Sequence, residues 1–258
     1  MARVETGSQI GSRKKDEGGI LETVKVVVQA LLIALVVRTL LFQPFNIPSG
    51  SLIPTLLIGD YLFVSKYTYG YSRHSIPFSP PILNGRVWAS EPKRGDIAVF
   101  KLPSDGTTDY IKRVIGLPGD KIQMVDGILH INGKAVERKR IEDYQTTDAY
   151  NRPIAVPQYM ETLPNGVSHR IIERDGDNGY WDNTYVYTVP PGKFFMMGDN
   201  RDNSQDSRDE SAVGYVPFEN FVGRAEVIFF SIDEHASAWR VWEWPQTVRW
   251  NRIFNPIR

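Results

Sequence analysis

At one point the chain reads Phe194-Phe-Met-Met197 and then Gly198-Asp-Asn-Arg-Asp-Asn-Ser-Gln-Asp-Ser-Arg208. The four apolar residues predict a buried strand, so the polar run begins where a core ends. Of its eleven residues, eight are charged or amide residues and two more carry hydroxyl groups. Side chains of this kind, fixed by hydrogen bonds to one another, are typical of a scaffold that holds another group in place. We therefore expect a functional site beside this strand.

On both sides of this stretch, short apolar or alternating segments are separated by Gly-Asp, Pro-Gly and Asn-Gly turn signals. No convincing long helix follows Phe42. This spacing predicts a mainly β fold, as a barrel or as folded-over sheets. The expected strands are Tyr61–Tyr67, Asp96–Leu102, Asp109–Ile115, Lys121–Met124, Ile128–Ile131, Tyr185–Val189, Lys193–Met197 and Arg224–Ile232.

Two stretches fit this strand pattern poorly, residues 70–92, which are rich in Pro and Ser, and residues 138–183. Residues 138–183 are polar and irregular, and they predict an insertion that forms a small subdomain or long excursions, because compact domains rarely carry structureless loops of that length. The end of the chain carries Trp239, Trp242, Trp244 and Trp250, interleaved with arginines. Either this segment packs on the barrel, or it contacts lipid headgroups, where Trp and Arg are favoured.

The N-terminal region predicts a membrane anchor. Residues 1–19 are Gly/Ser-rich and charged, which indicates a disordered tail, and residues 20–42 are largely apolar. A cleaved secretory signal would need a pair of small residues at a cleavage site after the apolar run, and the sequence has none there. A buried helix of a soluble protein would be more amphipathic than Val26–Val37 is. An uncleaved transmembrane anchor fits best.

Lysine and arginine positions predict the orientation of this anchor. Five lie on its N-terminal side, and none lies between Gln43 and Ser65. The tail is expected in the cytoplasm, and residues 43–258 are expected to form an exported domain on the periplasmic or extracytoplasmic face of the inner membrane.

Bulk composition excludes several functions. The 258 residues suffice for one large or two modest domains, and 30 basic side chains balance 30 acidic ones, so no global field attracts nucleic acid. Cysteine is absent from the sequence, which removes disulfides, thiolate metal sites and cysteine nucleophiles.

A serine near the anchor is a candidate nucleophile. In Pro48-Ser-Gly-Ser51, the glycine between two serines permits the close backbone approach that an oxyanion site requires. Pro-Ser-Gly-Ser is also a common linker signature. Ser51 lies nine residues beyond Phe42 and can stand at most about 30 Å from the bilayer edge, so it would act at the membrane.

A base for this serine is expected to be a lysine rather than a histidine. Each of the four histidines, at positions 74, 130, 169 and 235, fits a surface or strand position better than a catalytic one. Strand alternation places Lys112 on one face with Tyr110 and Val114, where desolvation would lower its pKa. Arg113 cannot replace it, because a guanidinium does not deprotonate in proteins.

Four ordered segments together resemble the conserved boxes of bacterial type I signal peptidases, also called leader peptidases, which are serine proteases with a Ser-Lys dyad. The segments are Pro48-Ser-Gly-Ser-x-x-Pro-Thr-Leu-x-x-Gly-Asp60, Arg94-Gly-Asp96, Tyr110-Ile-Lys-Arg-Val-x-Gly-Leu-Pro-Gly-Asp120 and Gly198–Arg208. Their order, their spacing and the preceding anchor all match. The resemblance implies folded-over antiparallel β-sheets or a barrel, one N-terminal transmembrane helix and removal of signal peptides from exported preproteins.

The resemblance also implies a role for each matching residue. Ser51 matches the nucleophile, Lys112 the general base, Ser49 an oxyanion-hole donor and Ser204 the residue that orients the lysine. The polar run would support them through an Asp206–Arg208 ion pair and the structural members Asp199 and Arg201. Shallow apolar substrate pockets would be lined by Ile47, Leu62, Val99, Tyr110 and Ile111. Leu52 departs from the usual methionine, which affects packing rather than chemistry.

The same resemblance implies a monomer that needs no metal and no organic cofactor, and whose partners are signal peptides and the lipid bilayer. A calcium loop of the D-x-[DN]-x-[DN]-G type fails in the polar run, since Arg201 and Ser204 occupy its third and sixth positions. Two alternatives remain open, namely another Ser-Lys peptidase of this fold, such as a self-cleaving repressor or a pilin-maturation enzyme, and an inactive membrane-tethered binding homologue.

Overall fold

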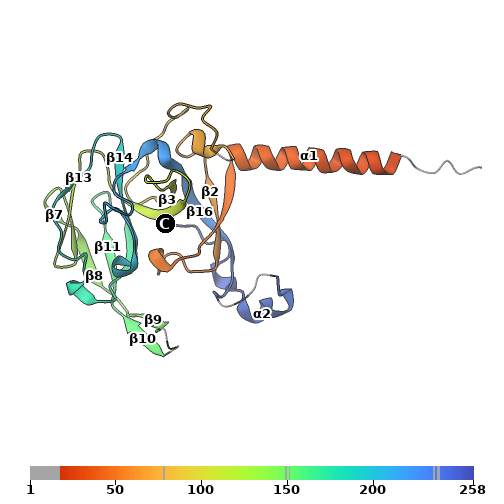
Figure 1. Ribbon diagram of the computed structural model, residues 1–258. Coiled ribbons are helices and arrows are strands. Elements are labelled where there is room, and N and C mark those ends of the chain that lie inside the picture. Colours follow the sequence, from red (N-terminus) through yellow and green to blue (C-terminus); the bar gives the residue numbers. More distant parts are fainter. Residues whose placement is uncertain (1–17, 78, 149, 151, 235, 237–238) are drawn as a thin grey trace, which may run out of the picture.

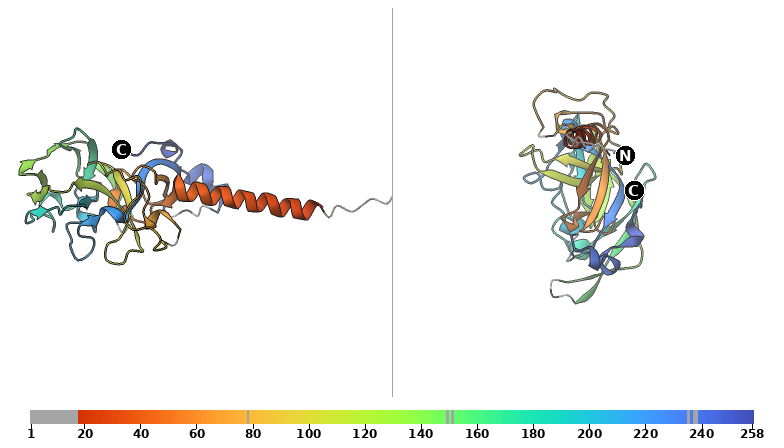
Figure 2. Two further views of the ribbon diagram at one scale, coloured as in Figure 1. Left: turned by 90° about the horizontal axis from the view of Figure 1, so that it is seen from above. Right: turned by 90° about the vertical axis from the view of Figure 1, so that its right-hand side faces the viewer.

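The computed structural model describes residues 18–258, apart from residues 78, 149, 151, 235 and 237–238. One long helix, α1 (Gly18–Leu40), projects away from a β-rich body (Figures 1 and 2). The predicted disordered tail lies outside the described residues except for Gly18 and Gly19, which belong to α1.

Helix α1 is long and apolar enough to cross a membrane over Leu21–Leu40, and none of that window is buried against the body. The expected anchor extended to Phe42, but the helix ends at Leu40 and Phe42 begins strand β1 (Phe42–Asn46). Pro44 explains the early end, because proline disfavours helical geometry at the residue before it. Phe42 instead pairs with Ser65 on β2.

The largest sheet has seven antiparallel strands in the order β1-β2-β16-β3-β4-β14-β15. After β1 these are β2 (Asp60–Ser65), β3 (Ile97–Lys101), β4 (Asp109–Gly116), β14 (Lys193–Met197), β15 (Val216–Pro217) and β16 (Phe221–Ser231). Register shifts along β16 mark bulges, which bend a strand and increase its twist. The prediction of a mainly β protein with folded-over antiparallel sheets is confirmed.

Both faces of this sheet are covered. On β3, Ile97 and Val99 pack into one apolar cluster and Ala98 and Phe100 into another, as alternation along a strand requires. This double burial explains why the Ile97–Phe100 stretch is apolar throughout rather than alternating.

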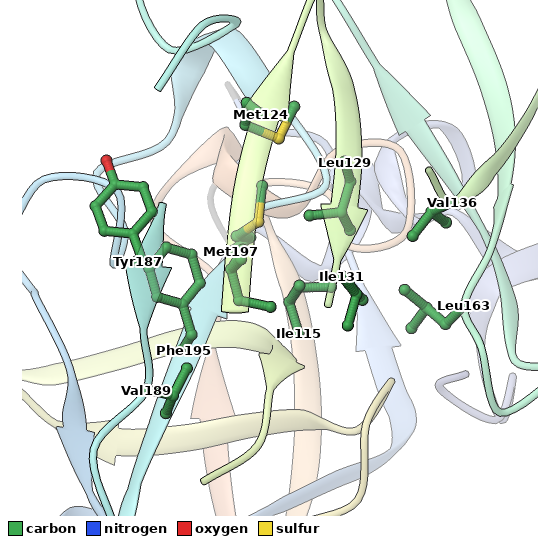
Figure 3. Packing of buried hydrophobic residues seen from close by; sticks show 11 residues of the cluster. Ile115, Met124, Leu129, Ile131, Val136, Leu163, Tyr187, Val189, Phe195 and Met197 are labelled. Carbon is green, nitrogen blue, oxygen red and sulfur yellow. The ribbon is translucent and has the colours of Figure 1, made fainter. Parts of the chain in front are cut away.

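A second layer contains a four-stranded sheet in the order β13-β5-β6-β7. Its strands are β5 (Lys121–Val125), β6 (Ile128–Ile131), β7 (Lys134–Ala135) and β13 (Tyr187–Thr188). Side chains from β5 and β6 pack against Ile115 of β4 and against Phe195 and Met197 of β14 (Figure 3). This third cluster joins the second layer to the strand that precedes the polar run.

The stretch expected as an insertion is organised into strands. A three-stranded sheet, β12-β11-β8, consists of β8 (Glu137–Arg140), β11 (Gln158–Thr162) and β12 (Ser168–Ile172). A separate hairpin of β9 (Tyr144–Thr147) and β10 (Pro153–Val156) extends from it (Figure 1). The region therefore has both a small sheet and a long excursion.

Short helices complete the described part of the chain: η1 (Gly50–Leu52), η2 (Arg73–Ser75), η3 (Gly176–Asn178), η4 (Arg201–Asn203), η5 (Phe218–Asn220), η6 (Val241–Glu243), α2 (Trp244–Thr247) and η7 (Trp250–Arg252). Near the C-terminus, Trp244 packs its ring against Phe230 at a centroid distance of 5.2 Å. Trp239, Trp242 and Trp250 are largely exposed. Packing thus accounts for one of these four tryptophans, and lipid contact by the others stays a prediction.

Candidate active site

Ser51 lies in the tight turn η1 between β1 and β2, with Ser49 as the extended residue before it. The turn is fastened to the polar run by Asn200, whose main-chain N–H donates to the Ser51 carbonyl at 3.1 Å and whose side-chain amide donates to the Gly50 carbonyl at 3.0 Å. Ser51 is 7% exposed, so its hydroxyl is largely shielded from water. The turn therefore presents Ser51 in a fixed position.

Lys112 lies in the middle of β4, paired with Ala98 of β3, and is 4% exposed. Its Nζ is 2.8 Å from Ser51 Oγ and 3.1 Å from the Ile111 carbonyl oxygen, and 5.3 Å from the centre of the Tyr110 ring. Burial lowers the pKa of Lys112 to about 8, although Asp206 and Asp199 act in the opposite direction. The desolvation expected from the strand pattern is thus present.

Gly198 allows the polar run to pack tightly against Ser51. A Cβ at position 198 would lie 2.3 Å from Ser204 Oγ and 2.5 Å from the Ser51 carbonyl oxygen, so only glycine fits there. Ser204 Oγ is buried and has no hydrogen-bond partner among the described residues. Ser204 therefore lies beside the Ser51 turn, but the expected hydrogen bond from Lys112 to it is not among the contacts of Lys112.

Three buried ion pairs hold the polar run in place. Arg208 pairs with Asp206 at 2.9 Å, as expected from the resemblance. Asp199 and Arg201 each find partners outside the run: Arg113 of β4 lies 2.7 Å from Asp199.

Arg201 reaches the insertion instead. It pairs with Glu161 of β11 at 2.5 Å, and His169 of β12 lies 3.4 Å from the same carboxylate. The polar run is thus fixed from two sides, by β4 and by the insertion. Sequence analysis missed Arg113 and Glu161 as partners, because pairings between distant segments leave no local signal.

These pairings keep the carboxylates ionised. Burial by itself would raise the pKa of Asp199, but Arg113 outweighs it and the pKa is lowered. The pKa of Asp206 is lowered in the same way, chiefly by Arg208. Two fixed negative charges therefore lie near Lys112 and raise its pKa, but burial lowers that pKa by more.

A cleft of about 540 Å³ opens over the serine and the lysine. It is lined by Pro48, Ser49, Gly50, Ser51, Asp109, Tyr110, Ile111, Lys112, Asn203 and Gln205. Tyr110 and Ile111, two of the predicted pocket residues, lie on its surface.

The other three predicted pocket residues lie deeper. Ile47, Leu62 and Val99 are at most 3% exposed and belong to the core cluster against which Ile111 packs. The structure therefore places them beneath the cleft rather than on its wall. Alternation along β2 and β3 turns Leu62 and Val99 toward this cluster, and Ile47, which follows β1, joins them there.

The described histidines lie in other surroundings. His74 is buried in η2, His130 lies in β6, and His169 is buried beside Glu161 and Asp199. His235 lies outside the described residues. The hydrogen bonds of Ser51 Oγ among the described residues include no histidine.

The sequence of this chain matches a known protein family and several named relatives. A sequence model described as "Signal peptidase, peptidase S26" matches residues 20–230. The chain is 43% identical over 245 residues to the signal peptidase I of Rickettsia typhi, covering 88% of this chain and 90% of that protein. It is 44% identical over 243 residues to the signal peptidase I of Rickettsia akari, covering 88% and 89%.

A crystal structure of a signal peptidase I from Enterococcus faecalis matches 52% of this chain and 97% of its own, with 28% identity and a TM-score of 0.31. A TM-score this low does not support a fold assignment, so the fold of this chain is assigned from its own strands and sheets. The sequence matches place the chain among the serine peptidases, which are hydrolases. It belongs to the signal peptidase family, peptidase family S26, as the sequence predicted.

Proposed function

We propose that this protein is a membrane-anchored serine endopeptidase that removes N-terminal signal peptides from exported preproteins, with Ser51 as nucleophile and Lys112 as general base. The 2.8 Å separation of Lys112 Nζ and Ser51 Oγ carries this proposal, because a base must lie within hydrogen-bond reach of the proton it takes. The relatives named signal peptidase I supply the substrate class.

Acylation begins with neutral Lys112. Its Nζ accepts the proton of the Ser51 hydroxyl, and Oγ attacks the carbonyl carbon before the cleavage point. The resulting oxyanion takes hydrogen bonds from the Ser51 main-chain N–H and the Ser49 hydroxyl. The tetrahedral intermediate collapses, Lys112 returns the proton to the leaving amine, and the signal peptide remains as an ester on Ser51.

Deacylation repeats these steps with water. Lys112 accepts a proton from a water molecule, the hydroxide attacks the ester, and the proton returns to Ser51 Oγ. Both steps need an uncharged lysine, and burial increases the uncharged fraction by lowering the pKa of Lys112 to about 8. The reaction needs neither a metal nor an organic cofactor.

The residues around the pair act through it. Ser204 would orient Lys112 once substrate closes the cleft, because it is buried beside the Ser51 turn with an unused hydroxyl. The ion pairs of Asp199, Arg201 and Asp206 keep the polar run rigid. Catalytic groups on such a support stay close to their productive geometry.

Substrate selection would come from the apolar part of the cleft. Tyr110 and Ile111 contact the segment before the cut directly, while Ile47, Leu62 and Val99 set the depth of the pocket from beneath. A shallow pocket of this kind accepts small side chains such as alanine and excludes larger ones.

The anchor would bring this cleft to its substrate. Helix α1 would cross the inner membrane once with its N-terminus in the cytoplasm, and residues 43–258, including the 138–183 insertion, would form the exported catalytic domain of a monomer. Five lysines and arginines precede or begin the span, and the next 23 residues after Phe42 carry none.

Cleavage of a purified preprotein in detergent tests the proposal. Ser51→Ala should lower the rate by at least about 10⁴-fold, as loss of a nucleophile does in serine peptidases. Lys112→Ala should lower the cleavage rate by about 10²-fold to 10⁴-fold. Matching circular dichroism spectra would show that both variants are folded, and normal cleavage by either one would reject the serine–lysine mechanism.

A further inference from the structure

Three carboxylates from separate segments lie close together beside η4. Glu173 follows β12, Asp182 follows η3 and Asp202 lies within η4. One oxygen from each lies within 4.8 Å of the other two. Glu173 and Asp182 are 0% exposed, which separates this group from an ordinary acidic surface.

Four oxygens of this carboxylate cluster are buried and have no hydrogen-bond partner among the described residues: both of Glu173, Oδ1 of Asp182 and Oδ1 of Asp202. The remaining oxygens of the two aspartates are fixed by main-chain donors. Gly179 N–H donates to Asp182 Oδ2 at 2.5 Å, and Asp175 N–H donates to Asp202 Oδ2 at 2.8 Å. Buried polar atoms are nearly always partnered, so the four oxygens call for a ligand.

The basic side chains near the cluster are engaged elsewhere. Arg138 Nη1 is 3.9 Å from Glu173, too far for a hydrogen bond, while it donates to the Gly127 carbonyl at 2.8 Å and its Nη2 pairs with Asp177 at 2.9 Å. Arg201 and Arg208 are held by Glu161 and Asp206.

When ionised, the three carboxylates would place more negative charge together than the nearby arginines offset. Burial raises the pKa of Glu173 to about 9, and it also raises the pKa of Asp182 and of Asp202. Asp175 and Asp177 nearby add further negative charge. At pH 7.5 Glu173 would hold a proton without a ligand, and a bound cation would displace that proton.

The backbone of Gly179 packs closely against the cluster. A Cβ at Gly179 would lie 2.4 Å from Asp202 Oδ1 and 3.1 Å from Asp182 Oδ2. No side chain can therefore occupy the place beside these two carboxylates.

We propose that Glu173, Asp182 and Asp202 bind a calcium ion. All donors are carboxylate oxygens, which favour hard cations, and oxygens on opposite sides of Ca²⁺ stand up to about 5 Å apart, which accommodates the spacing in the cluster. The ion would link the insertion to Asp202 of η4. Asp202 directly precedes Asn203, which lines the cleft, and lies two residues before Ser204. The absence of a linear calcium-loop motif in the polar run does not exclude this site, because the ligands of the proposed site come from three separate segments.

Calcium titration of the full-length protein in detergent at about pH 7.5 tests this proposal, after treatment with a chelator. Calorimetry should give one ion per chain with a Kd no weaker than about 10⁻³ M, the range of extracellular calcium modules. A hundredfold excess over Kd should raise the thermal midpoint by about 5 °C or more. The affinity should fall as the pH is lowered, because protons compete for the same oxygens.

Variants locate the ion. Glu173→Gln and Asp182→Asn should each remove the calcium-dependent rise, whereas Asp175→Asn, which removes an exposed neighbouring carboxylate, should keep it. No binding to the wild-type protein at about 10 mM Ca²⁺ would overturn the proposal. An equal rise in all three variants would overturn it as well, as would a Glu173→Gln protein that is stabilised without metal while the wild type binds none. Cleavage activity enters none of these readouts, so the result stands apart from the proposed peptidase function.

Discussion

Lys66 and Lys112 are two lysines that the fold buries almost completely, with exposures of 1% and 4%. Burial is the main reason that the pKa of each is lowered to about 8. Their neighbours differ. Lys66 Nζ donates to the Ser75 carbonyl oxygen at 2.5 Å, whereas Lys112 Nζ lies 2.8 Å from the hydroxyl of Ser51.

This difference decides what each lysine can do. A carbonyl oxygen only accepts hydrogen bonds, so the contact of Lys66 uses its protons and offers it none. A serine hydroxyl can give its proton to an uncharged amine and become a nucleophile. A lowered pKa therefore does not identify a catalytic lysine. The group that its Nζ contacts does.

Replacing each lysine by methionine, which keeps the length and loses the charge, gives the strongest contrast. Lys112→Met should lower the cleavage rate by about 10²-fold to 10⁴-fold, since general-base catalysis contributes that much. Lys66→Met should keep cleavage within about threefold, because Lys66 contacts no reacting group. Rates per folded enzyme, measured on one preprotein, provide the comparison. Equal losses in both variants would mean that Lys112 has no special role.

Acid pH should act through Lys112 alone. Its neutral form is the base, so kcat/KM should fall about tenfold for each pH unit below its pKa of about 8. The Lys66→Met variant should show the same acid limb as the wild type, although it has lost a group of similar pKa. A flat profile, or a limb that disappears with Lys66, would contradict the assignment.

Removing Lys112 should change stability and activity in opposite directions. Its pKa is lower in the folded state than in the unfolded chain, so the unfolded chain binds more protons between about pH 8 and 10.5 and stability rises with pH across that window. Below pH 8 the buried charge costs up to about 3 kcal/mol.

Lys112→Met should therefore raise the free energy of unfolding at pH 7 by about 1–3 kcal/mol, part of the gain being offset by the unpaired Ser51 hydroxyl. Denaturant titrations at pH 7 and about pH 10.5 measure this, and the difference between the proteins should vanish at the higher pH. A wild-type protein that is more stable than the variant at pH 7 would show that burial does not strain the lysine.

Sequence periodicity predicted the burial of Lys112 and gave no sign of the burial of Lys66. Lys112 lies within a strand whose alternation and motif could both be followed, and its desolvation is present in the structure. Lys66 follows β2 directly, and its burial depends on η2 closing over it, which no local pattern shows.

Long-range pairing set the limit elsewhere. The strands Ile128–Ile131 and Lys193–Met197 were predicted to the residue, because turn signals bound them. The polar run was predicted as a support, but its partners Arg113 and Glu161 come from β4 and β11. The depth of Ile47, Leu62 and Val99 likewise depends on how the sheets fold over one another.

Ser204→Ala has the smallest expected effect of these active-site substitutions. Its hydroxyl is buried without a hydrogen-bond partner among the described residues, and Lys112 contacts Ser51 and Ile111 instead. If Ser204 orients the lysine in the substrate complex, its loss should lower kcat about tenfold, the size of one hydrogen bond, with KM nearly unchanged. Ser204→Thr should restore part of the rate, because it keeps a hydroxyl. The corresponding change near Lys66, Ser75→Ala, should leave kcat unaffected, because the main-chain carbonyl remains. Equal kcat in the wild type and Ser204→Ala would show that Ser204 does not orient the lysine.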